Sequence, residues 1–196
     1  MLFPCACPRK EVGEVYPGAC RNGLPSGSEP RSWRVRVDDH PIRFNDRRLG
    51  AHEEVLAESV GDFVLKRAEG LFAYQLAVVV DDGWQGITDV VRGSDLLTST
   101  ARQIYLQELL QLPRPSYLHL PVAIGRTGDK LSKQTKAQAI PTCEREAPAV
   151  LAQTLEFLGH EPPQAFPSIQ EAWEWIKPIW QTRNIPAVKE RSVNHA

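Results

Sequence analysis

Short runs of alternating or β-branched residues predict strands in the first half of the chain. Runs of this kind occur at 33–37, 61–67 and 87–91. Pro41 breaks the pattern over 38–45, and the Gly-, Ser- and Pro-rich segment 22–32 predicts a loop. The continuous apolar stretch 71–82 fits a buried strand and a helix equally well, because periodicity alone does not separate the two.

Apolar residues at helical spacing then predict a long helix that ends near Pro113. Its apolar positions are Ile104, Leu106, Leu109 and Leu110. Ser99 or Thr100 is the expected cap, because a hydroxyl can accept a hydrogen bond from the first unpaired backbone N–H groups. Residues 118–124 are apolar again and lead into a polar loop over 125–139.

The tail of the chain predicts two helices. The first covers 149–158, and the second begins at Ser168, where Ser168 and Glu171 form a capping box. Helices that alternate with strands along the chain indicate an α/β fold.

Composition and charge are those of an ordinary globular protein. The chain has 196 residues, of which 42% are hydrophobic, with 23 Lys and Arg against 24 Asp and Glu. A net charge of −1 excludes a polycationic tail and an acidic disordered segment, but it leaves nucleic-acid binding open. The apolar run 71–80 is too short for a membrane span, and the N-terminus has no signal-peptide pattern, so we expect a cytoplasmic protein.

Three of the four cysteines crowd the first 20 residues. Cys5 and Cys7 can turn both sulfurs toward one ion, and Cys20 supplies a third thiolate. Tyr16, four residues before Cys20 across a Pro-Gly turn, is the fourth donor available in this segment. The spacing is therefore compatible with a structural zinc site and also with three incidental thiols at a frayed terminus.

The loop that begins at Gly125 is a candidate phosphate site. It carries Lys130 and Lys133 around Ser132, and two ammonium groups can neutralise charge that develops on a phosphate in a transition state. The loop contains no Walker motif. The alternative is a solvated basic loop without a ligand.

Two further side chains are candidate ligand contacts. Arg92 follows a predicted strand, and its guanidinium fork suits a carboxylate, although an ion pair with Asp89 or Asp95 is the alternative. The hydroxyl of Tyr74 can serve a ligand, although a buried structural tyrosine is the alternative. His119, within an apolar segment, is expected to be structural.

These segments together resemble one branch of the class I aminoacyl-tRNA synthetases. KLSKQ at 130–134 is similar to the KMSKS signature of that class, with Leu131 and Gln134 at the variant positions. The segments 74–82, 85–93 and 117–121 resemble the glutamyl branch. The cysteine cluster with Tyr16-Pro17-Gly18 narrows the resemblance to the glutamyl-Q tRNA(Asp) synthetases, over about 5–180.

The resemblance implies a role for each candidate residue. Cys5, Cys7, Tyr16 and Cys20 match zinc ligands, Tyr74 and Arg92 match glutamate-binding residues, and Lys130, Leu131, Ser132, Lys133 and Gln134 match the ATP loop, with Lys130 and Lys133 as its catalytic lysines. It also implies a partial Rossmann-type catalytic domain with a zinc-binding insertion and a small helical tail. The expected division is a zinc-binding region over 1–60, the second half of the catalytic domain over 61–145, and the helical tail over 146–196.

The activity implied by the resemblance is ATP-dependent activation of glutamate, with Mg²⁺, followed by transfer to queuosine in the anticodon loop of tRNA(Asp). We expect a monomer. The alternatives are a non-catalytic zinc module that docks RNA or protein, and a fragment of a glutamyl-tRNA synthetase.

The sequence contains no HIGH motif, which class I synthetases carry in the first half of the nucleotide-binding fold. A truncated gene product, a misplaced start and a remnant would each account for this. Without that half, the lysines of the KLSKQ loop would act on a nucleotide open to water, where charges are worth little. We therefore expect that these 196 residues alone do not form glutamyl-adenylate. Glutamate-dependent ATP–pyrophosphate exchange measures this directly, and robust exchange would contradict it.

Overall fold

The computed structural model describes residues 1–24, 26–125, 128–131, 140, 143, 145–163 and 165–193. The chain forms two compact units that interleave along the sequence. The first unit comprises Met1–Asn45, Ala51–Val90 and Thr98–Ser116, and the second comprises Asp46–Gly50, Val91–Leu97 and Tyr117–Ala196. The expected three-region division stays a prediction.

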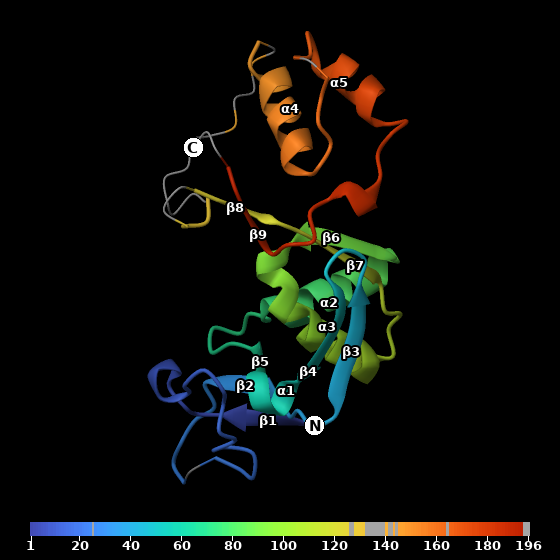
Figure 1. Ribbon diagram of the computed structural model, residues 1–196. Helices are drawn as coiled ribbons and strands as arrows, with labels where there is room; N and C mark the ends of the chain where they lie inside the picture. Colours follow the sequence, from blue (N-terminus) through green and yellow to red (C-terminus); the bar gives the residue numbers. More distant parts are fainter. Residues whose placement is uncertain are drawn as a thin grey trace. The chain divides into compact units, whose positions relative to one another are not determined.

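A three-stranded antiparallel sheet lies at the N-terminal end of the first unit (Figure 1). Its order is β1 (Leu2–Cys5), β2 (Ser32–Val35) and β5 (Phe63–Lys66). The strands predicted over 33–37 and 61–67 are therefore confirmed. Strand β1 was not predicted; Pro4 is compatible with it because β1 is an edge strand, where a missing N–H costs little.

The alternation along β2 does not decide which side chains are buried. The pairing of β2 with β5 shifts register between Trp33 and Arg34. As a result Trp33 is 43% exposed, whereas Arg34 is only 7% exposed. The arginine and not the tryptophan therefore enters the interior of this unit, next to the point where the register shifts.

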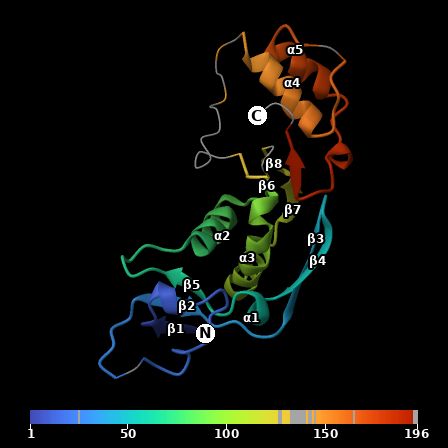
Figure 2. The same cartoon turned by 60° about the vertical axis from the view of Figure 1, so that its left-hand side comes forward.

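The apolar stretch 71–82 belongs mainly to a helix, α2 (Tyr74–Gln85), which lies beside α3 (Leu97–Leu110) in both views (Figures 1 and 2). The predicted cap of α3 is wrong. A 3-10 turn, Ser94–Leu96, runs directly into α3, so Ser99 lies inside the helix. Its hydroxyl instead accepts a hydrogen bond from the side-chain amide of Gln75 at 3.0 Å, which links the two helices.

Within the segment 38–45, only residues 38–40 are irregular, and the residues from Pro41 onward form most of β3 (Pro41–Asp46). This strand is followed by β4 (Gly50–Val55) and by a short helix, α1 (Leu56–Ser59). Proline is tolerated at the first position of a strand, which is where Pro41 lies, so it does not prevent pairing. The prediction failed because the pattern was interrupted at the strand boundary.

A four-stranded sheet has the order β4-β3-β7-β6, with β6 at Asp89–Gly93 and β7 at Ser116–Leu120. Its β3 and β7 run parallel, with Asp46 opposite Tyr117. The third predicted strand is thus confirmed as β6. The apolar segment 118–124 is divided by Pro121 between β7 and a separate strand, β8 (Val122–Ile124).

The second unit contains both predicted tail helices, α4 (Ala147–Phe157) and α5 (Ile169–Ile176). The hydroxyl of Ser168 accepts a hydrogen bond from the backbone N–H of Glu171 at 3.2 Å, which confirms Ser168 as the N-cap of α5. After the tail helices, β9 (Glu190–Ser192) pairs in parallel with β8. Short 3-10 turns complete the elements at Arg9–Glu11 and Thr182–Asn184. Within the part of the chain described, the helices are too short or too polar to cross a membrane.

Candidate functional site

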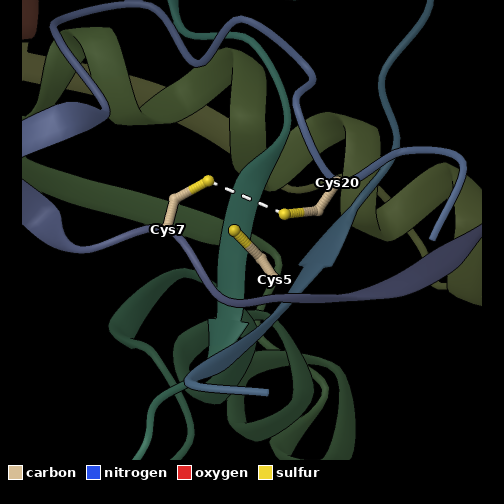
Figure 3. Close-up of side chains that lie close together, drawn as sticks. All are labelled: Cys5, Cys7 and Cys20. Atoms are coloured by element: carbon tan, nitrogen blue, oxygen red, sulfur yellow. Dashed lines mark hydrogen bonds between the residues drawn. The ribbon is translucent and has the colours of Figure 1, made fainter. Parts of the chain in front are cut away.

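The three N-terminal cysteines converge in the first unit. Figure 3 shows their sulfur atoms pointing toward one another from β1 and from the loop before β2. All three sulfurs lie within 4.8 Å of one another, and those of Cys7 and Cys20 are 3.6 Å apart. Cys5 and Cys20 are buried in a small apolar cluster with Phe3 and Tyr16. Incidental thiols at a frayed terminus would not be packed in this way.

Tyr16 completes the group with its hydroxyl. The Tyr16 oxygen lies 3.5 Å from the Cys5 sulfur and accepts a hydrogen bond from the backbone N–H of Cys20 at 2.9 Å. Tetrahedral zinc with Zn–S bonds of ~2.3 Å and a Zn–O bond of ~2.0 Å places its sulfurs about 3.8 Å apart and the oxygen about 3.5 Å from each sulfur. The 3.6 Å between the Cys7 and Cys20 sulfurs and the 3.5 Å between the Cys5 sulfur and the Tyr16 oxygen are close to these values.

Close packing shifts the pKa values of the donors in different directions. Burial raises the pKa of the Cys5 thiol, but hydrogen bonds with Tyr16, the Cys7 backbone and Arg34 outweigh it and lower the pKa to about 7. For Cys7, burial and the neighbouring thiols act together and raise the pKa to about 11. Burial and Cys5 likewise raise the pKa of Tyr16. A divalent cation offsets the repulsion between such donors when they lose their protons.

Two arginines and a buried aspartate connect the cluster to the rest of the first unit. The guanidinium of Arg34 lies 4.0 Å above the centre of the Tyr16 ring and donates to the backbone carbonyl of Asp62. Arg21, next to Cys20, donates to both carboxylate oxygens of Asp62, at 2.5 and 2.6 Å. The cysteine segment is thus tied to β2 and to the residues just before β5. This support is not apparent from the sequence, because the pairing of Arg21 with Asp62 spans 41 residues.

Gly61 holds the backbone of Tyr16 in place. The Tyr16 N–H donates to the Val60 carbonyl at 3.0 Å, and Tyr16 forms a parallel bridge with Gly61. A Cβ atom at Gly61 would lie 2.5 Å from the Tyr16 carbonyl oxygen, and φ there is +69°. Only glycine combines this φ with such close backbone contact.

Gly61→Ala is expected to destabilise the protein by more than 2 kcal/mol, because strain at positive φ costs about 1–3 kcal/mol before the clash with Tyr16 is added. Gly70→Ala is the matched control: its φ is +82°, and an added Cβ meets nothing within 4 Å. Chemical denaturation compares the two. Equal losses of stability would show that the contact with Tyr16 contributes nothing.

Arg92 lies near the end of β6, as predicted, and its surroundings belong to the second unit. Its Nε donates to the Nε2 of His119 at 3.0 Å, and its guanidinium lies 5.5 Å from the centre of the Tyr117 ring. His119 is fully buried, and its Nδ1 is 2.6 Å from a carboxylate oxygen of Asp46. The sequence did not predict a role for Asp46, although an acidic residue at the end of a strand is a usable signal once β3 is known.

Tyr74 is the first residue of α2, in the first unit, and is 48% exposed. It is therefore not a buried structural tyrosine. Because Tyr74 and Arg92 belong to different units, their shared role in glutamate binding stays a prediction.

Lys130 lies where the predicted ATP loop begins. The chain turns back after β8, since the Leu131 N–H donates to the Ala123 carbonyl at 2.9 Å and Lys130 bridges to Ile124. The Lys130 ammonium group forms an ion pair with Asp95. The other predicted ATP contacts, Ser132, Lys133 and Gln134, lie outside the described residues, so the roles of this loop stay predictions.

Residues 20–176 match the profile of tRNA synthetases class I (E and Q), catalytic domain. The chain is 53% identical over 195 residues to a protein of Thiobacillus denitrificans named glutamyl-Q tRNA(Asp) synthetase, and 49% identical over 194 residues to the protein of that name from Chromobacterium violaceum. Each match covers 94% of this chain and 64% of the relative.

Solved structures show the same fold at lower identity. A glutamate-tRNA synthetase from Elizabethkingia anophelis superposes with a TM-score of 0.73 at 18% identity, over 99% of this chain and 48% of that one. A glutamate tRNA ligase from Elizabethkingia meningosepticum, solved in complex with its amino acid, gives a TM-score of 0.70 at 19% identity, over 97% and 47%.

Proposed function

The chain belongs to the class I tRNA synthetases (E and Q). We therefore propose that it takes part in the ATP-dependent activation of glutamate and in the transfer of that glutamate to queuosine in the anticodon of tRNA(Asp). The family and the mixed α/β fold agree with the sequence predictions. The chain spans 64% of the length of the first curated relatives it matches.

The observation that carries the proposal is the identity of 49–53% with relatives named glutamyl-Q tRNA(Asp) synthetase, which extends over 94% of this chain. The environment of Arg92 supports it. The Nε of Arg92 donates to a buried histidine, and a guanidinium group suits a carboxylate such as those of glutamate.

The proposed reaction has two steps. A carboxylate oxygen of glutamate attacks the α-phosphorus of ATP, the bond to pyrophosphate breaks, and glutamyl-adenylate forms. A hydroxyl of the queuosine cyclopentene-diol then attacks the carbonyl carbon and gives up its proton, and AMP leaves. Arg92 and Tyr74 bind the glutamate, and Lys130 and Lys133 stabilise negative charge on the phosphates.

The zinc ion in this proposal is structural. Cys5, Cys7, Tyr16 and Cys20 would hold it, and the bound ion would cross-link the start of the chain to the turn at Tyr16-Pro17-Gly18. All four donors are protein groups, so a tetrahedral ion would have no open position for a substrate. A monomeric state and a cytoplasmic location stay predictions.

The test uses a hybrid enzyme, in which the part of the Thiobacillus denitrificans relative outside the match is joined to this chain in the relative's own order. The hybrid is assayed for transfer of radiolabelled glutamate to queuosine-containing tRNA(Asp). The same tRNA without queuosine, and tRNA(Glu), are the control substrates. We expect label on queuosine-containing tRNA(Asp) alone.

Other outcomes favour the alternatives. Label on the 3′ end of tRNA(Glu) would indicate a glutamyl-tRNA synthetase. A folded hybrid that retains zinc but transfers no glutamate to either tRNA would favour a non-catalytic zinc module.

A further inference from the structure

Asp46, His119 and Arg92 form a continuous hydrogen-bonded chain within the second unit. We propose that Asp46 and His119 are positioning residues that fix the orientation of the Arg92 guanidinium for a substrate carboxylate. This inference rests on the proposed function, in which Arg92 binds glutamate. The three side chains come from neighbouring strands of one sheet. Asp46 ends β3, His119 lies on β7 and Arg92 lies on β6.

The partners determine where the proton of His119 lies. Arginine has only donors, so the Nε2 of His119 must accept the hydrogen bond from Arg92 Nε at 3.0 Å. A neutral imidazole with an acceptor at Nε2 carries its hydrogen on Nδ1. That N–H donates to Asp46 Oδ2 at 2.6 Å. Each hydrogen bond therefore requires the other. Donation runs in one direction only, from Arg92 to His119 and from His119 to Asp46.

Asp46 is a rigid anchor for this chain. Its Oδ2 also accepts from the backbone N–H of His119 at 3.0 Å, and its Oδ1 accepts from the N–H groups of Arg48 and Leu49 at 2.9 and 2.8 Å. Burial raises the pKa of Asp46, but the hydrogen bonds from Leu49, His119 and Arg48 outweigh it and hold the pKa below its ordinary value. The carboxylate stays ionised and keeps the His119 ring in one orientation.

Tyr117 limits the remaining freedom of Arg92. Its ring lies 5.5 Å from the guanidinium carbon and is stacked with the His119 ring at 6.3 Å, with an interplanar angle of 13°. The guanidinium is therefore held at Nε by a histidine and covered on one face by an aromatic ring. These two contacts restrict rotation about the end of the side chain, as a group that pairs with a carboxylate in one orientation requires.

The experiment separates positioning from simple stability. In the hybrid enzyme, His119→Leu removes the acceptor for Arg92, whereas His119→Gln retains an acceptor near the position of Nε2. We expect His119→Leu to raise the glutamate KM in ATP–pyrophosphate exchange by about 10- to 100-fold, with the ATP KM unchanged, because small displacements of a binding group have effects of this size. His119→Gln should restore most of the glutamate affinity.

His160→Leu is the matched control. His160 is also a buried histidine of the second unit, and its Nε2 also accepts a hydrogen bond, from the backbone N–H of Gln181 at 3.2 Å. Its loss should lower stability without changing the glutamate KM. The inference is overturned if His119→Leu leaves the glutamate KM unchanged, or if both KM values rise together in His119→Leu and His160→Leu.

A second readout does not depend on activity. In protein labelled with [15N]arginine, the Nε–H signal of Arg92, assigned by its loss in Arg92→Lys, should be protected from exchange in the wild type and in His119→Gln. It should lose protection in His119→Leu. An unprotected signal in the wild type overturns the positioning role, whereas a protected signal without glutamate-dependent exchange contradicts only the proposed function.

Discussion

Replacing Cys5 by serine is expected to reduce bound zinc from one ion per chain to almost none. The Cys5 sulfur is fully buried and lies beside both the Tyr16 hydroxyl and the other two thiols, so no water can take its place as a ligand without opening the cluster. Loss of a structural metal commonly costs more than about 4 kcal/mol. We expect a stability loss of this size, together with rapid proteolysis near the N-terminus, since metal binding and local folding are coupled.

Cys143→Ser is the control, because Cys143 is exposed. Metal analysis by mass spectrometry and limited proteolysis compare the two variants. Wild-type protein purified with zinc present that contains no zinc, and whose thiols all react without a chelator, would refute the metal site.

Arg92→Ala in the hybrid enzyme is expected to lower kcat/KM for glutamate by about 30- to 1,000-fold, which corresponds to about 2–4 kcal/mol and is typical of removing one partner of a desolvated charge pair. Arg92→Lys should be almost as harmful, because an ammonium group has no fork and cannot reproduce the contact with His119. The ATP KM should change little in either variant.

Arg43→Ala is the matched substitution for this experiment. Arg43 lies on β3 and forms an exposed ion pair with Glu53, and such pairs contribute little. Its kinetics should equal those of the unmodified hybrid. If Arg92→Ala also leaves the kinetics of glutamate unchanged, Arg92 serves only the packing around His119.

Local patterns predicted the elements whose signals are complete within a few residues. The strand near 33–37, the strand near 61–67 and the cap at Ser168 are examples, because alternation and capping depend on neighbours in sequence. Strand β3 was missed because Pro41 lies at its first position, where proline does not prevent pairing. Asp46 was missed for the same reason, since its place at the end of β3 brings it next to His119.

The candidate metal site was only partly predictable for a related reason. The donors are close in sequence, so spacing identified Cys5, Cys7, Tyr16 and Cys20. What positions them comes from later in the chain, in the contact of Gly61 with Tyr16 and of Asp62 with Arg21. Arg34 is buried next to a register shift in β2 that no alternation of residue types specifies.

The contact between Tyr16 and Gly61 also determines when the cluster can form during biosynthesis. The fourth donor is fixed through a backbone hydrogen bond to Val60, 44 residues further along the chain. At a synthesis rate of ~5–20 residues per second, the ribosome makes Gly61 about 2–8 s after Cys20. During that interval a metal ion would meet three thiols without a fixed tyrosine. If the proposed zinc site forms, the nascent chain would therefore complete its coordination shell only after the residues that precede β5 have left the ribosome.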